Sequence, residues 1–248
     1  MAPPLPLRLA RRELRTGLKG FRIFLACLAL GVAAIAAVGS VSSAMMAGIE
    51  GDARRLLGGD VDLRLVHRPA SDDQRAFLAA SGEVSEVLEM RAMARTLDGA
   101  ARTLVELKAV DGAYPLVGAV TLAPATGLDI ALAERDGTFG AVAEQSLADR
   151  LGLTVGDRLR LGDATLELRA VLAAEPDRIV TFASFGPRLM VSEAALPATG
   201  LVQVGSLIRY HYRVNLPAGT AAKPWLDRLD GRFPAAGWRT RSPESAAP

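Results

Sequence analysis

The chain of 248 residues contains one cysteine and two histidines, and this scarcity excludes some classes of protein. Cys27 has no partner for an intrachain disulfide, so a domain outside the cytoplasm would have to fold without such cross-links. His67 and His211 are far apart in the sequence and lack the close spacing of metal ligands on a helix or knuckle. We therefore predict no metal site and expect both histidines on the surface.

The motifs of nucleotide-binding and nucleophilic enzymes are also missing. No Gly-x-x-x-x-Gly-Lys-Ser/Thr loop is present, and the segment 17–20 (GLKG) lacks the backbone cradle that holds phosphates. No Gly-x-Ser-x-Gly sequence presents a serine nucleophile. The acidic pair Asp72 and Asp73 suits the first turn of a helix, where negative charge meets the positive end of the dipole. We predict no catalytic residue, no bound cofactor and no ATP hydrolysis by this chain.

Charge is absent from residues 23–49. At about 1.5 Å per residue, a helix of this length reaches roughly 40 Å and exceeds a hydrocarbon core about 30 Å thick. A buried helix of a soluble protein rarely needs so long an apolar surface. A cleaved export signal is the stronger alternative, because residues 42–44 (SSA) are small, but the apolar part of such signals typically has about 7 to 15 residues. We predict a transmembrane helix over residues 23–48.

The segment before this run is basic, and its apolar residues recur at helical spacing. Six cationic side chains stand against Glu13 alone, and we expect them to anchor residues 1–22 at the membrane surface: Arg8, Arg11, Arg12, Arg15, Lys19 and Arg22. Positive flanks stay on the cytoplasmic side, and an amphipathic helix would place these cations near anionic headgroups. A solvated basic tail is the alternative. The remaining residues are mildly acidic, so the pI near 9.0 does not indicate nucleic-acid binding.

Small residues recur at every fourth position of the predicted span. They form two adjoining stripes, which comprise Ala29, Ala33 and Ala37, and Ala36, Ser40, Ala44 and Gly48. In lipid, small residues allow another helix to approach closely. We predict a packing seam with other transmembrane helices, although the general abundance of alanine is an equally good explanation.

From residue 50 onward, short alternating runs separated by glycine, proline and aspartate predict an α+β domain with a mixed sheet. Ser71 and Gln74 form a capping box for a helix that Gly82 ends. We expect a hairpin at Asp98-Gly99, then an irregular stretch to about residue 137. The block 139–172 reads as strand, short helix, glycine stop and hairpin. The remaining predictions are a strand at 188–191, a helix capped by Ser192, a long strand at 208–216 and a last helix at about 225–233.

Several segments resemble a known family. They are FGAVAEQSLADRLGLTVGDRLRLGDATLELRAVL (139–172), GGDVDLRLVHRP (58–69), VDGAYPLVG (110–118) and FGPRLMVS (185–192), together with the basic entry LRLARRELRTGLKGFRIFL. In combination they are similar to FtsX/MacB-type ABC transporter permeases, most closely the YbbP-like branch. The resemblance covers nearly the whole chain.

The resemblance implies a bacterial inner-membrane protein with a cytoplasmic amino terminus. Residues 1–22 would be cytoplasmic, 23–48 transmembrane, 49–240 a MacB-like periplasmic core domain, and 241–248 a tail toward a further span. Family members carry at least three more membrane helices, so this chain, which ends at SPESAAP, is expected to be an amino-terminal fragment. The implied partners are an ABC ATPase subunit that binds ATP and Mg²⁺, a second permease copy and membrane lipids.

The function implied by the resemblance is mechanotransmission, in which ATP-driven movement of the membrane helices is converted into work outside the membrane, such as release of lipids, lipoproteins or hydrophobic compounds. Two alternatives remain open. A single-pass anchored enzyme would show a deep pocket with several carboxylates, a serine and His211 or His67. A membrane-tethered adaptor would bind a lipid or lipoprotein.

Overall fold

The computed structural model describes residue 22 and residues 24–40, 53–178 and 186–243. The chain divides into two compact units between Gly51 and Asp52. In the first unit, residues 24–40 form an α-helix with exposed side chains. No helix in the described part of the chain has both the length and the hydropathy needed to cross a bilayer. The span over 23–48 therefore stays a prediction, and residues 23 and 41–48 lie outside the described ones.

The second unit alternates short strands and helices. After a helical turn at residues 53–57, its strands are β1 (Val61–Val66), β2 (Glu83–Thr96), β3 (Arg102–Val110), β4 (Thr121–Ala123), β5 (Glu134–Arg135), β6 (Thr138–Glu144), β7 (Arg158–Leu161), β8 (Ala164–Ala174), β9 (Arg188–Ser192), β10 (Arg209–Asn215) and β11 (Arg239–Arg241). Its helices are α2 (Asp72–Ser81), α3 (Leu128–Leu132), α4 (Gln145–Leu151), the 3₁₀ turn η1 (Glu193–Ala195), α5 (Leu196–Thr199) and α6 (Ala222–Arg232).

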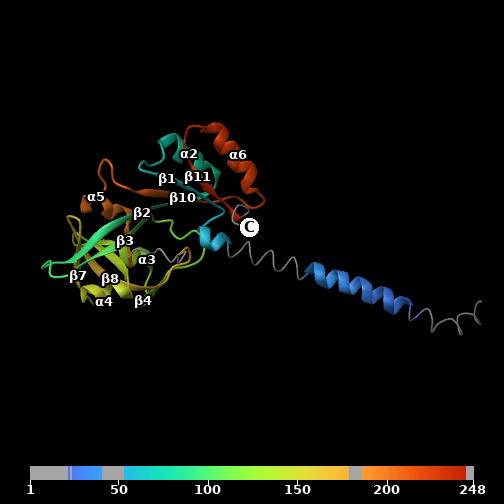
Figure 1. Ribbon diagram of the computed structural model, residues 1–248, viewed down its shortest axis with the longest axis horizontal. Helices are drawn as coiled ribbons and strands as arrows, with labels where there is room; N and C mark the ends of the chain where they lie inside the picture. The colour runs from blue at the N-terminus through green and yellow to red at the C-terminus, as the bar shows by residue number, and fades with distance from the viewer. Residues whose placement is uncertain (1–21, 23, 41–52, 179–185, 244–248) are drawn as a thin grey trace, which may run out of the picture. The chain divides into compact units, whose positions relative to one another are not determined.

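One half of the second unit is a four-stranded antiparallel sheet in the order β11-β1-β10-β2. With its two helices it follows the chain order β1-α2-β2-β10-α6-β11, which is a ferredoxin-like arrangement. Helices α2 and α6 lie on the same face of this sheet (Figure 1). Strand alternation gives that face the apolar side chains of β1 and β10, such as Leu63 and Tyr212, and Trp225 of α6 is buried with them. We call this half the ferredoxin-like layer.

The other half is inserted between β2 and β10 and closes on itself. Strand β2 pairs with β3, and the pairing continues through β9, β6, β8 and β7 back to β2. A closed ring has no free strand edges, so each of its six strands is hydrogen-bonded on both sides. We call this half the ring. Strand β2 belongs to both halves, because its first residues pair with β10 and its last residues with β7 (Figure 1).

Two apolar clusters pack against opposite faces of the ring strands. In β6, Ala141 and Ala143 belong to the larger cluster and Val142 to the smaller one, as strand alternation requires. The β6–β8 pairing shifts register between Ala141 and Val142. Because the shift skips one residue of β8, Leu168 joins the larger cluster and Ala170 the smaller one. The larger cluster continues into the ferredoxin-like layer, so both halves share one core.

Helix α2 begins at the predicted capping box. Gln74 N donates to Ser71 Oγ at 3.3 Å, and Ser71 N donates to Gln74 Oε1 at 2.9 Å. We expect Ser71→Ala to lower the free energy of unfolding by about 1 kcal/mol, because one amide of the first turn loses its acceptor. Urea titration of the full chain in mild detergent, followed by circular dichroism, measures this. Ser71→Asp keeps a capping oxygen and should stay near wild type; equal losses in both variants would contradict the capping role.

Most of the predicted elements are confirmed. The strand at 61–66, the hairpin of β2 and β3, the order of elements in 139–172 and the left-handed cap at Gly152 are present. The prediction for Ser192 is wrong in detail. Its side chain makes no capping hydrogen bond, and the segment after it is a 3₁₀ turn followed by one helical turn, α5. The stretch before residue 137 contains β4, α3 and β5 rather than irregular chain throughout.

Candidate functional site

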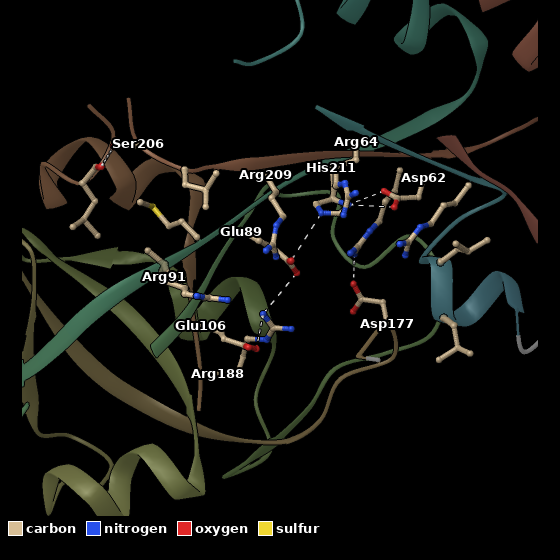
Figure 2. Close-up of a pocket in the computed structure, with 18 residues that line it drawn as sticks. Asp62, Arg64, Glu89, Arg91, Glu106, Asp177, Arg188, Ser206, Arg209 and His211 are labelled. Carbon is tan, nitrogen blue, oxygen red and sulfur yellow. Dashed lines mark hydrogen bonds and ion pairs between the residues drawn. The ribbon is translucent and has the colours of Figure 1, made fainter. Parts of the chain in front are cut away.

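A pocket of about 620 Å³ lies against the face of the ferredoxin-like layer that α2 and α6 leave free. It is built by alternation, because Asp62 and Arg64 of β1 and Arg209, His211 and Arg213 of β10 point away from the apolar face. Strands β2, β3 and β9 of the ring contribute further charged side chains (Figure 2). The loop around residues 201–207 and the helical turn at 53–57 complete its wall.

Beneath the pocket lies a buried ionic network centred on Lys108 of β3. Its side chain is 1% exposed, and Nζ donates to Glu175 at 2.5 Å, Asp177 at 2.7 Å and the Tyr114 hydroxyl at 2.9 Å. The Tyr114 hydroxyl donates to Asp177 at 2.6 Å. Arg213 of β10 pairs with the same Asp177. All three protons of the ammonium are therefore used, and the network connects the ring to the ferredoxin-like layer.

A second group of charges extends the network along the pocket. Arg188 of β9 bonds to Glu175 at 3.2 Å and lies 3.7 Å from Glu89 of β2. His211 Nδ1 is hydrogen-bonded to Asp62 at 2.9 Å, and its Nε2 lies 3.9 Å from Glu89. The contacts of Glu89 with Arg188 and His211, and that of His211 with Asp62, are among the dashed lines across the pocket in Figure 2. Acidic and basic groups alternate here, so each carboxylate faces a basic side chain from another strand.

The electrostatics follow from this alternation. Burial alone would raise the pKa of Asp177, but Lys108 and Arg213 outweigh burial and hold that pKa well below its ordinary value. Burial also opposes ionisation of Glu89, yet His211 and Arg188 lower its pKa. Burial and the neighbouring Asp177 raise the pKa of Tyr114, so its hydroxyl keeps the proton that it donates. Burial lowers the pKa of Lys108, and the charges of Asp177 and Glu175 oppose this shift. The carboxylates of Asp177 and Glu89 are thus held ionised near neutral pH by the cations around them.

The pocket contains a serine, a histidine and several carboxylates, which are the residue types of a hydrolase. His211 has a carboxylate near each ring nitrogen, Asp62 on one side and Glu89 on the other. Ser206 lies apart from His211 (Figure 2), and its hydroxyl donates to Leu201 O while it accepts from Gln203 N. A nucleophile needs a base within hydrogen-bond reach. This arrangement therefore lacks the serine–histidine pair that acyl transfer needs.

Metal binding has no better basis. Within residues 24–40, 53–178 and 186–243, no group of three His, Cys, Asp or Glu side chains is arranged to hold an ion. The carboxylates of the pocket face arginine, lysine or histidine instead. The ionic network instead connects strands of the two halves, and further cationic side chains lie at the opening of the pocket.

The predicted site residues belong to the first unit or lie outside the described residues. Five of the six membrane-anchoring cations, Arg8, Arg11, Arg12, Arg15 and Lys19, lie outside the described residues, as do Ala44 and Gly48 of the predicted seam. Arg22 is exposed, and Ala29, Ala33, Ala36, Ala37 and Ser40 are exposed on helix 24–40. Both roles therefore stay predictions.

The surface prediction holds for His67, which is exposed, and is wrong for His211. The side chain of His211 is 12% exposed because it lies between Asp62 and Glu89. Alternation along β10 had placed it on a polar face with Arg209 and Arg213, and that pattern was the available signal. Nothing local indicated that the ring would cover this face, or that Lys108 would be buried.

Comparisons with known proteins agree on one family. The model of the MacB-like periplasmic core domain matches residues 23–229. The uncharacterized ABC transporter permease YbbP of Escherichia coli (strain K12) is 31% identical over 190 residues, which are 75% of this chain and 22% of that protein. This chain thus spans less than a quarter of the relative's length.

The comparison with solved structures also matches two transporter domains. One is the periplasmic region of MacB from Actinobacillus actinomycetemcomitans, with 11% identity, a TM-score of 0.49 and coverage of 80% of this chain and 95% of that one. The other is the extracellular domain of the ABC-type transporter YknZ from Gram-positive bacteria, with 12% identity, a TM-score of 0.49 and coverage of 73% and 100%.

Proposed function

The chain belongs to the family of MacB-like periplasmic core domains, and from this premise we propose that it is the extracytoplasmic part of an ABC transporter permease. The family match over residues 23–229 is the observation that carries the proposal. The resemblance to FtsX/MacB-type permeases predicted from the sequence is confirmed by this match and by the relative of 31% identity. The proposed role is mechanical: the domain receives movement from membrane helices and passes it to a substrate or partner outside the membrane.

The fold suits the transmission of force because its two halves are tied together in three ways. Strand β2 runs through both halves without interruption. The larger apolar cluster is common to both. The network of Lys108, Asp177 and Arg213 adds buried charge-assisted contacts across the junction, and such contacts are strong in a low-dielectric interior. A displacement applied at one half would therefore move the other half with it.

The proposed setting is the bacterial inner membrane, with residues 1–22 on the cytoplasmic side and the second unit outside. The proposed partners are an ABC ATPase subunit, which binds ATP and Mg²⁺, and a second permease copy. Membrane lipids would contact the basic segment, and the seam of small residues would pack against other membrane helices. No enzymatic role is proposed, because the pocket lacks a paired nucleophile and base.

Association with an ATPase tests this function. When the tagged chain is expressed with its genomic neighbours and purified in mild detergent, we expect it to retain a Walker-motif ATPase. Ala33→Leu combined with Ala37→Leu fills the predicted seam and should reduce the retained ATPase severalfold, because the membrane helices can no longer approach closely. The matched double change Ile35→Leu with Val38→Leu alters the opposite face of the helix and should have no effect. Purification of the chain without any ATPase would overturn the proposal.

Topology supplies the control for that experiment. In a Cys27→Ala background, Ala100→Cys at the tip of the exposed β2–β3 hairpin should react with an impermeant maleimide while the inner membrane is intact. Ala2→Cys should react after that membrane is opened. The reverse pattern would place the second unit in the cytoplasm.

A further inference from the structure

Arginines are concentrated around Arg64 at the opening of the pocket. In the β1–β11 register, Arg64 lies directly opposite Arg239 and diagonal to Arg241. In the β1–β10 register it lies diagonal to Arg209, which follows from the pairing of Val66 with Arg209. Directly opposed residues of antiparallel strands have Cβ atoms about 5 Å apart and diagonal ones about 7 to 8 Å. Four guanidinium groups from three neighbouring strands therefore share one face.

This arrangement carries an electrostatic cost, which Asp62 offsets only in part. Burial, and then the charges of Arg241, Arg239 and Arg209, lower the pKa of Arg64. Among the described residues, the side chains of Arg64, Arg209 and Arg241 make no hydrogen bond or ion pair. Asp62 lies directly opposite Arg241 and Glu89 directly opposite Arg209, but both carboxylates lie against His211 and neither makes an ion pair with these arginines. Like charges placed opposite one another destabilise a sheet, so the cluster is explained better by an anion that it receives than by folding.

The other residues that line the pocket also favour an anionic ligand. Its lining holds six arginines against four carboxylates, and these carboxylates are Asp62, Glu89, Glu106 and Asp177. Arg213, whose side chain is 7% exposed, keeps its buried Nε without a hydrogen-bond partner among the described residues. Two leucines that line the pocket, Leu207 and Leu56, are exposed and give it an apolar rim. A ligand that combines an anionic group with an apolar part would match both the arginines and these leucines.

We propose that this pocket binds the phosphate group of an anionic ligand through Arg64, Arg209 and Arg241. Guanidinium groups bind phosphate oxygens in a bidentate manner, and several of them converging from different strands can neutralise a doubly charged group. The same phosphate group occurs in soluble phosphate esters and in phospholipid headgroups. The inference deepens the proposed function, since it names what the extracytoplasmic domain contacts, but the binding itself can be measured whether or not an ATPase associates.

Calorimetric titration of the full chain in an uncharged detergent with inorganic phosphate tests the site. We expect saturable binding that weakens as salt is raised, because the interaction is between exposed charges. The triple variant Arg64→Gln, Arg209→Gln, Arg241→Gln should bind at least roughly tenfold more weakly. Arg102→Gln, at an exposed arginine of β3 away from the pocket, is the matched control and should bind like wild type.

The thermal unfolding midpoint at low salt serves as the control that the triple variant is correctly folded. Because the three arginines repel one another, the triple variant should unfold at the same temperature as wild type or higher. If it unfolds earlier, Arg209→Gln alone serves as the test, since this side chain is exposed. Undiminished phosphate binding by a folded triple variant, or no binding of any phosphate compound by the wild type, would overturn the proposal and leave the ATPase association unaffected.

The two sources of phosphate are distinguished by adding dihexanoyl phosphatidylglycerol in place of inorganic phosphate. Binding at least tenfold tighter than phosphate, weakened by Leu207→Ser, would support a lipid headgroup, because the apolar rim then contributes. Equal affinity for both compounds, insensitive to Leu207→Ser, would support a soluble phosphate ester.

Discussion

Replacing Asp177 by asparagine is expected to lower the free energy of unfolding by about 3 to 5 kcal/mol, because it removes the carboxylate shared by two buried cations. Asp177 is paired with Lys108 at 2.7 Å and with Arg213, and the Asp177 side chain is 1% exposed. The cations cannot turn to water, since the Lys108 side chain is 1% and that of Arg213 7% exposed. Most of the loss in stability comes from burying a cation without its counter-ion, and the lost hydrogen bond itself contributes less.

The effect of Asp177→Asn should depend on pH in a defined direction. The pKa of Asp177 is depressed in the folded state, whereas that of an unfolded aspartate is about 3.9. Its ionisation therefore stabilises the fold fully above about pH 4, and this contribution is lost as pH falls further, through the folded-state pKa. The difference in stability between wild type and Asp177→Asn should be constant from pH 5 to 7 and should narrow below pH 4.

Urea unfolding of the full chain in mild detergent measures both effects. Circular dichroism follows both halves, while the fluorescence of Trp225 and Trp238 follows the ferredoxin-like layer. Asp227→Asn changes an exposed carboxylate of α6 and should cost less than about 0.5 kcal/mol. An Asp177→Asn variant as stable as this control at pH 7 would show that the network contributes nothing to stability, and it would remove one of the three links between the halves.

The features that could be predicted from the sequence are those that depend on residues close to one another along the chain. The capping box of Ser71 and Gln74 and the left-handed Gly152 depend on residues within a few positions, and both are present as predicted. Alternation along β10 likewise assigned Tyr212 and His211 to opposite faces, since period 2 is a local property of strands. The α+β class follows from the same local signals.

The closure of the ring and the ionic network could not be derived in this way. Closure depends on β7 pairing with β2, where Leu161 lies opposite Ala94, and neither segment carries a signal for the other. Lys108 alternates with apolar neighbours, so its pattern indicated a polar face of a hairpin. It is buried because Glu175 and Asp177, which are distant in sequence, cover that face with their own charges. Which distant strands pair with each other is determined by the packing of the whole core. No local segment of the sequence therefore indicates the pairing.

Replacing Trp225 by alanine should be the most damaging change on the helical side of the ferredoxin-like layer, at about 3 to 5 kcal/mol. Trp225 is 2% exposed, packs in the larger apolar cluster and lies against Phe77 of α2 with ring centroids 6.1 Å apart. Trp225 thus contributes, together with the contact between Phe77 and Phe233, to the packing of α6 against α2. Truncation leaves a cavity under two helices that the rigid sheet cannot fill.

Trp225→Phe separates packing from polarity in this effect. Trp225 Nε1 is buried and has no hydrogen-bond partner among the described residues, so phenylalanine removes an unsatisfied donor while it keeps an aromatic ring against Phe77. We expect a cost below about 1.5 kcal/mol, well under the loss from alanine. Urea unfolding followed by circular dichroism compares the two, since fluorescence would lose Trp225 as a probe. If phenylalanine proved as costly as alanine, Nε1 would have to donate a hydrogen bond that stabilises the helical face, and the packing explanation would fail.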